Sequence, residues 1–375
     1  MIYLDYSATT PVNQDVLDSF IKACNRYPGN PNSLHKLGVE SKNMIDKATN
    51  QIASIMGVKN KEIIYTSGSS ESNNLAIKGI CLMYQNRGKH IITTDLEHSS
   101  IYGPIDYLLK LGFEVSYVKL TQEGFVDLEH LKSLMRDDTI LVTINSVNSE
   151  LGIQQPINEI GELLKCYPKC YFHVDMTQSV GKVKVNCENI DLISFSAHKF
   201  FGLKGIGVLI KKDKIEIESL IHGGKSTTKY RSGTPALPLI VSLAKALRLA
   251  TEQIDKDLAY VKELNLYLRE SLKGYDKLYI NSPETAIPHI LNISVVGVKP
   301  ETLLHALEEN EIYISTQSAC SSSHSESKAV YAVTKDASRA SSSIRISLSK
   351  LTTKYEIDKF LEVFDECYRR LTNLR

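Results

Sequence analysis

From Glu62 to Asn74 the chain reads EIIYTSGSSESNN, in which a short apolar run gives way to glycine and hydroxyl residues and then to a helical pattern. The run predicts a buried strand, and the polar residues predict the turn at which a helix begins. The first N–H groups of a helix have no partner inside it, and Ser69 and Ser70 add hydroxyl groups at the same place. The stretch therefore indicates a cradle for an anion, most naturally a phosphate group. An ordinary serine cap is the alternative.

The succession of a short strand and a helix recurs over residues 33–255, which is typical of an α/β fold around a mostly parallel sheet. Helices are expected over residues 33–56 and 71–86, each closed by a left-handed glycine, Gly57 and Gly88. Seven runs are candidate strands: residues 62–66, 90–94, 114–118, 140–144, 171–174, 192–195 and 207–210. Functional groups of such sheets gather where the strands end and the following helices begin.

The length of 375 residues allows two to three domains. Residues 16–255 are expected to form a large domain around the sheet. Beyond them, long helices are expected over residues 258–272 and 354–371, with only scattered strands between. Residues 1–15 and 256–375 are therefore expected to form a smaller α+β domain.

Composition and charge exclude several classes of protein. The chain carries 44 Lys and Arg against 43 Asp and Glu, so no long-range field favours nucleic acid or an anionic membrane as a partner. No apolar run approaches the roughly 18 residues that cross a bilayer, and Asp5 stands where a signal peptide needs a basic residue. The seven cysteines are few and odd in number, which favours reduced thiols. We expect a soluble, cytoplasmic protein.

Two of the candidate strands end in residues that suit a cofactor. Residues 171–174 lead to Asp175, and a carboxylate at the end of a buried strand is costly unless a cation, such as a protonated ring nitrogen, meets it. Residues 192–195 lead to Lys199, a partly desolvated amine of the kind that Schiff-base enzymes use as a nucleophile. An aspartate that caps a helix and a lysine beside a glycine turn are the alternatives.

Together the phosphate cradle, the carboxylate and the lysine are the three groups that hold pyridoxal phosphate. His98 follows the second candidate strand and could stack on the cofactor ring. Cys320 lies in a serine-rich stretch, residues 315–327, which is read as a mobile loop that could bring the thiol to the cofactor. Arg345 could clamp a substrate carboxylate, although an exposed strand arginine is the alternative.

The six other cysteines are expected to be packing residues: Cys24, Cys81, Cys166, Cys170, Cys187 and Cys367. Cys166 and Cys170 form a C-x₃-C pair, but no second pair of ligands lies nearby, so no metal site is predicted.

Motifs in order along nearly the whole chain resemble those of the cysteine desulfurases, which are class V, fold-type I pyridoxal phosphate enzymes. The matching motifs are LDYSATTP at 4–11, GNPNS at 29–33 with His35, TSGSSESNN at 66–74, EH at 97–98, HVD at 173–175 with QS at 178–179, Ser196 with HK at 198–199, RSGT at 231–234 and SAC at 318–320. The last motif resembles the group with the long catalytic loop. The resemblance implies a homodimer in which the large domain binds the cofactor and the small domain carries the catalytic cysteine.

The resemblance also implies roles for single residues. Lys199, His98 and Cys320 would be catalytic: Lys199 holds the cofactor and acts as base, His98 stacks on the ring, and Cys320 accepts sulfur from L-cysteine to leave alanine. Asn30 and Arg345 would bind the substrate carboxylate. The other implied cofactor contacts are Asp175 at the ring nitrogen, Gln178 at the ring hydroxyl, Ser69, Ser70, Ser196 and His198 at the phosphate, and Thr234 reaching the partner subunit's cofactor. The sulfur would pass to an acceptor protein of an iron–sulfur or thiolation pathway.

The chain departs from the family pattern at several positions. Ser149 stands in place of an amide near the ring hydroxyl, where a hydroxyl can still form a hydrogen bond. Leu203 replaces the usual proline, and Gln317 replaces a glycine, which should stiffen the catalytic loop. Lys225 lies in a segment, residues 222–227, that differs from the usual one, and the chain stops at residue 375 without the longer tail of some relatives.

Other functions fit less well. Residues 224–226 look like half of a nucleotide-binding P-loop, but Ser219 stands where that loop needs glycine. The glycines of residues 205–207 precede a strand, whereas a dinucleotide-binding motif follows one. A binding protein without catalysis would not need the lysine, aspartate and cysteine together. A selenocysteine lyase or another lyase of sulfur substrates remains the alternative.

Overall fold

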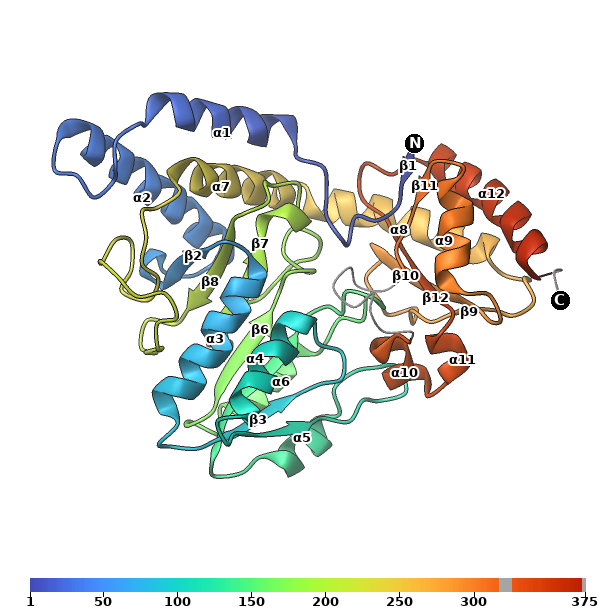
Figure 1. The fold of residues 1–375 in the computed structure, drawn as a ribbon, viewed down its shortest axis with the longest axis horizontal. Coiled ribbons are helices and arrows are strands. Elements are labelled where there is room, and N and C mark those ends of the chain that lie inside the picture. The colour runs from blue at the N-terminus through green and yellow to red at the C-terminus, as the bar shows by residue number, and fades with distance from the viewer. Residues whose placement is uncertain (317–325, 373–375) are drawn as a thin grey trace.

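The computed structural model describes residues 1–316 and 326–372. Its centre is a seven-stranded sheet (Figure 1), in the order β2-β8-β7-β6-β5-β3-β4. The strands are β2 (Ile63–Thr66), β3 (His90–Thr93), β4 (Glu114–Tyr117), β5 (Thr139–Asn145), β6 (Tyr171–Asp175), β7 (Leu192–Ser196) and β8 (Gly207–Lys211). All neighbours are parallel except β8, which is antiparallel to both β2 and β7. The predicted mostly parallel α/β sheet is confirmed.

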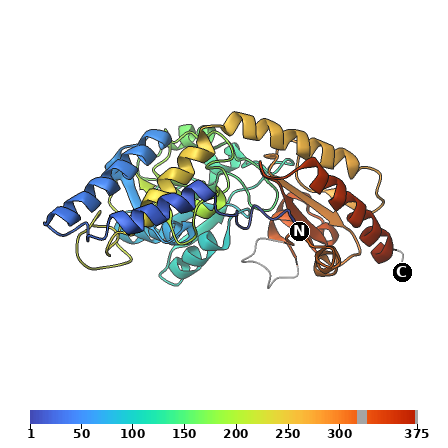
Figure 2. The same ribbon diagram turned by 90° about the horizontal axis from the view of Figure 1, so that it is seen from above.

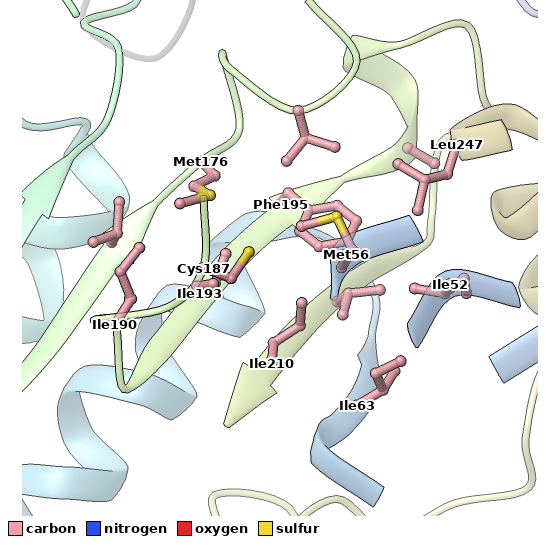
Figure 3. Close-up of a cluster of buried hydrophobic side chains, with 14 of the residues drawn as sticks. Ile52, Met56, Ile63, Met176, Cys187, Ile190, Ile193, Phe195, Ile210 and Leu247 are labelled. Carbon is pink, nitrogen blue, oxygen red and sulfur yellow. The ribbon is translucent and has the colours of Figure 1, made fainter. Parts of the chain in front are cut away.

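Helices cover both faces of this sheet. The helices of this region are α1 (Gln14–Arg26), α2 (Lys36–Met56), α3 (Ser69–Tyr84), α4 (Ser99–Leu109), α5 (Leu128–Leu134), α6 (Ile157–Leu164) and α7 (Leu237–Thr251). Successive strand residues point to opposite faces, so Ile193 packs with α2 and α7 whereas its neighbour Leu192 packs with α3 and α4. Figure 3 shows the first of these cores, where Ile52 and Met56 of α2 and Leu247 of α7 meet the sheet.

A smaller region (gold to red in Figures 1 and 2, with the blue N-terminus) lies beside the sheet and carries a core of its own. It contains the antiparallel strands β12-β10-β9 and the two-stranded parallel sheet β1-β11. The bounds are β1 (Ile2–Tyr3), α8 (Ile254–Ser271), β9 (Leu278–Ile280), β10 (Ile290–Val295), α9 (Pro300–Glu308), β11 (Ile312–Tyr313), α10 (Lys328–Thr334), α11 (Ala337–Ala340), β12 (Ser343–Ser347) and α12 (Lys354–Thr372). Because Ile2 and Leu4 belong to this core, the N-terminus starts in the small region and then crosses to the sheet. We call residues 4–10 the N-terminal strap.

The two predicted glycine caps have different outcomes. Gly57 ends α2 in the left-handed conformation, with φ of 66°, as expected. Gly88 is not left-handed, and α3 ends earlier, at Tyr84. A Cβ atom on Gly88 would lie 2.1 Å from the carbonyl oxygen of Asp138, so this glycine is needed for a close backbone contact instead.

The prediction that six cysteines pack in the interior is correct for four and wrong for two. Cys24 and Cys166 are exposed, because each lies on the solvent side of its helix or turn. Cys81, Cys170, Cys187 and Cys367 are buried: burial raises the pKa of the Cys187 thiol to about 11. Among the described residues, no helix is long and apolar enough to cross a membrane.

Candidate active site

A cavity of about 190 Å³ lies at the edge of the sheet where the parallel strands end. Nine of the residues predicted for the site line it: Ser69, Ser70, His98, Ser149, Asp175, Gln178, His198, Lys199 and Arg345. Ser196 stands next to them, with its Oγ 3.4 Å from the Oγ of Ser69. Strands far apart in sequence therefore bring most of the predicted groups to one place.

One end of the cavity is the start of α3. The helix begins at Ser69, directly after β2, so its first N–H groups point toward the cavity edge. A Cβ atom on Gly207 would lie 2.6 Å from the Cα of Gly68, so a bare glycine in β8 is required for the loop to pass this close. Glu71 fixes the turn by accepting from Ser67 N at 2.7 Å. This arrangement fits a phosphate group.

The carboxylate of Asp175 is held by a network that runs to His98. Asn73 Nδ2 donates to Asp175 Oδ2 at 2.8 Å and to Ser100 Oγ at 2.9 Å. Ser100 Oγ lies 2.8 Å from His98 Nδ1, which also accepts from the backbone N–H of Ser100 at 3.1 Å. Because a backbone N–H can only donate, Nδ1 is an acceptor and the proton of the neutral ring is on Nε2. One amide therefore orients both the predicted ring-nitrogen partner and the predicted ring-stacking residue.

Lys199 lies in a single 3₁₀ turn after β7, formed by Ala197–Lys199. Its Nζ donates to the backbone carbonyls of Ser7 and Ala8 in the N-terminal strap, each at 2.7 Å. The strap is fixed at the same turn, since Thr10 N donates to the carbonyl of His198 at 2.9 Å. The amine is thus held at the edge of the cavity by acceptors that carry no charge.

His198 is kept neutral by its surroundings. Burial and, after it, the positive charge of Lys199 together lower the pKa of its imidazole to about 4. Its Nδ1 lies 3.1 Å from the hydroxyl of Thr9. A neutral imidazole with one N–H can serve as a hydrogen-bond donor to an anion at this end of the cavity.

Arg345 enters the cavity from β12 of the small region and is only 1% exposed, so the alternative of an exposed strand arginine is wrong. Its Nη2 donates to Asp5 Oδ1 at 2.8 Å, and its Nη1 donates to the carbonyl of Ser149 at 2.9 Å. The buried Nε has no hydrogen-bond partner among the described residues. The guanidinium is therefore held from one side and still has a donor to offer to a small acid.

The cavity thus combines a phosphate cradle, a strand-end carboxylate and a strand-end lysine, which is the set of groups that pyridoxal phosphate requires. A family model described as Aminotransferase class-V matches residues 2–360. A protein of Dictyoglomus turgidum named cysteine desulfurase IscS is 39% identical over all of this chain and 96% of its own length. One of Klebsiella pneumoniae with the same name is 41% identical over all of this chain and 94% of its own.

The chain belongs to the class-V aminotransferase family, among the cysteine desulfurases. A solved NifS-like protein is similar in structure over the whole of both chains, with a TM-score of 0.92 and 34% identity. The NifS-like protein from Rickettsia africae covers 98% of this chain and 99% of its own, with a TM-score of 0.88 and 31% identity. The comparisons confirm the family resemblance, and proteins of this family depend on pyridoxal phosphate.

Two of the predicted site residues, Asn30 and Thr234, lie away from the cavity in the described part of the chain. Asn30 is exposed, and its side chain accepts from Asn32 N at 2.9 Å. Thr234 is also exposed. This position is compatible with the predicted contact to the cofactor of a partner subunit, because such a residue lies on the surface of a single chain. Cys320 lies outside the described residues.

The sequence reasoning missed Asn73 and Asp5, which orient Asp175 and Arg345 respectively. Asn73 lies in the predicted anion cradle at residues 66–74. Its side chain is 0% exposed because α3 packs this face against the sheet, and the sequence alone does not show which face that is. Asp5 lies 340 residues from Arg345 in the chain, so no local pattern joins them. The sequence signal for Asp5 was its place in the LDYSATTP motif at residues 4–11, which matches the family.

Proposed function

We propose that this chain is a cysteine desulfurase, which removes sulfur from L-cysteine, releases L-alanine and leaves a persulfide on Cys320. The observation that carries the proposal is the cavity in which Lys199 and Asp175 of the sheet face Arg345 of the small region. The relatives named cysteine desulfurase support it.

Bound pyridoxal phosphate would supply an electron sink for the electrons at the substrate Cα. The hydroxyls of Ser69, Ser70 and Ser196, the His198 ring and the start of α3 hold the phosphate. Asp175 would keep the ring nitrogen protonated, and Gln178 and Ser149 would hold the ring hydroxyl. His98 would stack on the ring. Each of these groups except Ser196 lines the cavity.

Lys199 and Arg345 act on the substrate in this proposal. Arg345 binds the carboxylate of L-cysteine, and this orients the Cα–H bond toward the Lys199 amine, which takes the proton. The same amine then returns a proton, so acid and base functions need only one group at the cavity edge.

Cys320 is the sulfur acceptor. Its thiolate attacks the substrate sulfur, an S–S bond forms as the Cβ–S bond breaks, and Cβ is finally protonated to give alanine. The described residues on either side of its segment are fixed at the cavity. Ser315 exchanges two backbone hydrogen bonds with Arg345, and Ser327 Oγ donates to Glu150, next to Ser149, at 2.6 Å. Cys320 comes five positions after Ser315, and an extended chain of that length reaches about 17 Å.

We further propose a homodimer in which Asn30 and Thr234 reach a cofactor site through the subunit contact. An apolar patch supports it: Leu34 is 97% exposed, Leu37 48% and Val39 46%, all within the loop and first turn that follow Asn30. A patch of this kind on a soluble surface is typical of a protein contact.

Two further parts of the proposal concern organisation and location. Residues 16–255 form the cofactor-binding domain, and residues 1–15 and 256–375 form the small domain with the catalytic cysteine, as the separate cores support. The enzyme works in the cytoplasm and hands its sulfur to an acceptor protein for iron–sulfur clusters or thiolation. The six described cysteines are free, which supports a reducing compartment.

The test is turnover of L-cysteine by the purified protein loaded with pyridoxal phosphate. We expect equal amounts of alanine and transferable sulfur, and a persulfide that mass spectrometry assigns to Cys320. Cys320→Ala should lose sulfur transfer, whereas the exposed Cys24→Ala and Cys166→Ala should keep it. Persulfide formed by Cys320→Ala at the wild-type rate would refute the assignment. If Cys320→Ala still cleaved L-selenocysteine while the wild type ignored L-cysteine, the selenocysteine lyase alternative would hold.

A further inference from the structure

Lys182 is a buried lysine, 7% exposed, in the turn after β6. Gly181 directs it inward: this glycine has φ of +76°, and a Cβ atom on it would lie 2.7 Å from the Cβ of Phe200. Burial lowers the pKa of Lys182 well below its usual value, and the positive charges of Lys199 and Arg345 lower it further. Lys182 forms no ion pair with any described residue. A buried ammonium group without a counter-charge is costly to a fold, so the uncharged amine is favoured here.

The neighbours of Lys182 do not relieve this cost. Lys182 shares a second, small cavity of about 20 Å³ with Asp257 and His289. Asp257 is already paired with Lys350 at 2.9 Å. Burial lowers the pKa of His289 to about 3, so this ring is neutral near pH 7 and adds no charge of either sign.

The hydrogen-bond partner of Lys182 is Gln178, which lines the larger cavity. Lys182 Nζ donates to Gln178 Oε1, and Gln178 Nε2 donates to the carbonyl of Ser7 at 3.0 Å. The same carbonyl accepts from Lys199 Nζ at 2.7 Å. Because the Ser7 carbonyl can only accept, the amide is fixed at both ends and cannot exchange its oxygen and nitrogen.

We propose that Lys182 is a positioning residue of the active site, which holds the Gln178 amide with its NH₂ group toward the Ser7 carbonyl and the cavity. One amide hydrogen goes to Ser7, and the other remains for the ring hydroxyl of the cofactor. Without Lys182, the Gln178 oxygen loses its donor, so the amide is held at one end only and can rotate its NH₂ group away from the cavity. The inference rests on the proposed cofactor site.

The first test is binding of pyridoxal phosphate to the cofactor-free Lys182→Met variant, measured by fluorescence titration. We expect the dissociation constant to rise about five- to tenfold, the effect of one hydrogen bond, and the visible absorption maximum of the loaded protein to shift. The Tm of the cofactor-free variant should stay within a few degrees of wild type or rise, because methionine fills the space without a buried amine. A purely structural lysine would instead lower the Tm and leave both cofactor measurements unchanged, and that result would overturn the proposal.

Lys211→Met is the matched control. Lys211 is 2% exposed, and its Nζ donates to the backbone carbonyls of Ile215 and Lys212, at the end of β8 away from Gly207 and the cavity. Loss of this buried amine should leave cofactor binding and the absorption maximum at wild-type values. An equal shift in Lys211→Met would show that any buried lysine has this effect and would overturn the proposal.

Two variants of Gln178 test whether Lys182 acts through this amide. In a Gln178→Ala background, Lys182→Met should change the dissociation constant less than twofold, because the shared interaction is already gone. Full additivity would overturn the proposal. Gln178→Glu keeps Lys182 and gives it a carboxylate partner, so the Tm of the cofactor-free protein should rise while cofactor binding weakens. An unchanged Tm would overturn the proposal even if Lys182→Met does not fold. Wild-type protein that failed to bind pyridoxal phosphate would overturn the proposed function and the inference with it.

Discussion

Asp175 and Arg345 face the same cavity, but they are held in opposite ways. Asp175 belongs to the cofactor wall, which consists of Asp175, Asn73, Ser100 and His98. These residues lie on one sheet and on the two helices, α3 and α4, that pack against it. Their hydrogen bonds are uncharged apart from the one to the carboxylate itself.

Arg345 belongs to the substrate wall, which consists of Arg345, Asp5 and the carbonyl of Ser149. Its ion pair joins residues 340 positions apart, and it forms only when the N-terminal strap and β12 lie beside the sheet. The comparison suggests that the cofactor wall is complete once the sheet has folded, whereas the substrate wall depends on how the small region docks. Changes to the two walls should therefore affect different binding constants.

Lys199→Ala removes the amine that serves both the cofactor and the substrate in the proposed function, so it has the largest expected effect. Activity with L-cysteine should fall by more than about 1000-fold, because the covalent attachment and the base are lost together. The protein should also lack the visible absorption band of a covalently held cofactor. Lys214→Ala, at an exposed lysine, should keep both. A band in Lys199→Ala that borohydride still reduces would place the attachment on another lysine.

Asp5→Asn tests the substrate wall. The side chain of Arg345 is 1% exposed and that of Asp5 18%, so the pair is largely shielded from water. Loss of one charged hydrogen bond of this kind is worth roughly 1.5–3 kcal/mol, so we expect KM for L-cysteine to rise about 10- to 100-fold. The dissociation constant of pyridoxal phosphate should change less than twofold.

The control for Asp5 is Asp15→Asn, because Asp15 is exposed and its contact with Lys245 is 3.8 Å long. This variant should leave KM at the wild-type value. An Asp5→Asn enzyme that lost cofactor affinity but kept its KM would contradict the division into two walls.

Asn73→Ala is the corresponding change in the cofactor wall. It removes the hydrogen-bond donor to both Asp175 and Ser100 Oγ, so the dissociation constant of pyridoxal phosphate should rise about tenfold, the effect of one to two hydrogen bonds. KM for L-cysteine at saturating cofactor should change less than threefold. Asn74→Ala is the matched neighbour, since within the described chain the Asn74 side chain donates to the backbone carbonyl of Ser70, at 2.9 Å on the surface, and to no other group. If both variants weakened cofactor binding equally, the network from Asn73 to His98 would have no special role.

The two walls also differ in how far the sequence predicted them. The cofactor wall follows from local patterns: each strand end carries its polar residue, and parallel strands place their ends at one edge, so Asp175, Lys199 and His98 were found together. Asn73 was missed because a helix interior gives no sign of which side chain is buried against a sheet. The substrate wall was predicted only as a single arginine. Its partner Asp5 comes from the other end of the chain, and long-range pairing of this kind leaves no periodic signal.

The misplaced predictions have a similar physical cause. A glycine after a helical pattern is typical of a helix cap, but the role of Gly88 is a close backbone contact with Asp138, so the cap predicted there is wrong. For Arg345 the sequence left two alternatives, a buried substrate contact and an exposed strand residue, because alternation alone does not show which face of β12 is buried. Asn30 was assigned to the substrate from the resemblance, and its surface position in a single chain makes its role depend on the subunit contact.

Glu97 offers the smallest change in activity and sharpens the comparison, because it is a carboxyl group next to His98 of the cofactor wall that does not act as a charge. It is 8% exposed, and its Oε1 accepts from Thr94 Oγ1 at 2.7 Å and from Asn145 N at 3.1 Å. Its Oε2 has no partner among the described residues. Burial raises the pKa of Glu97 to about 8, so the group is mostly protonated at pH 7 in the folded protein.

The consequence is a pH-dependent cost to stability that Glu97→Gln should remove. Between the unfolded pKa of about 4.3 and the folded pKa of about 8, only the unfolded chain releases the proton, so the wild-type free energy of unfolding falls as pH rises and becomes level above that window. Glutamine does not titrate, and each pKa unit corresponds to about 1.4 kcal/mol. We therefore expect urea unfolding of the cofactor-free proteins at pH 5, 6, 7 and 8 to show that the free energy of unfolding of the variant rises relative to that of the wild type at each step. The total change should be about a few kcal/mol. Activity at pH 7 should stay within twofold, because an amide keeps the neutral state of the group. A stability difference that did not grow with pH would mean that Glu97 is ionised in the fold, and the cofactor wall would then depend on charge as the substrate wall does.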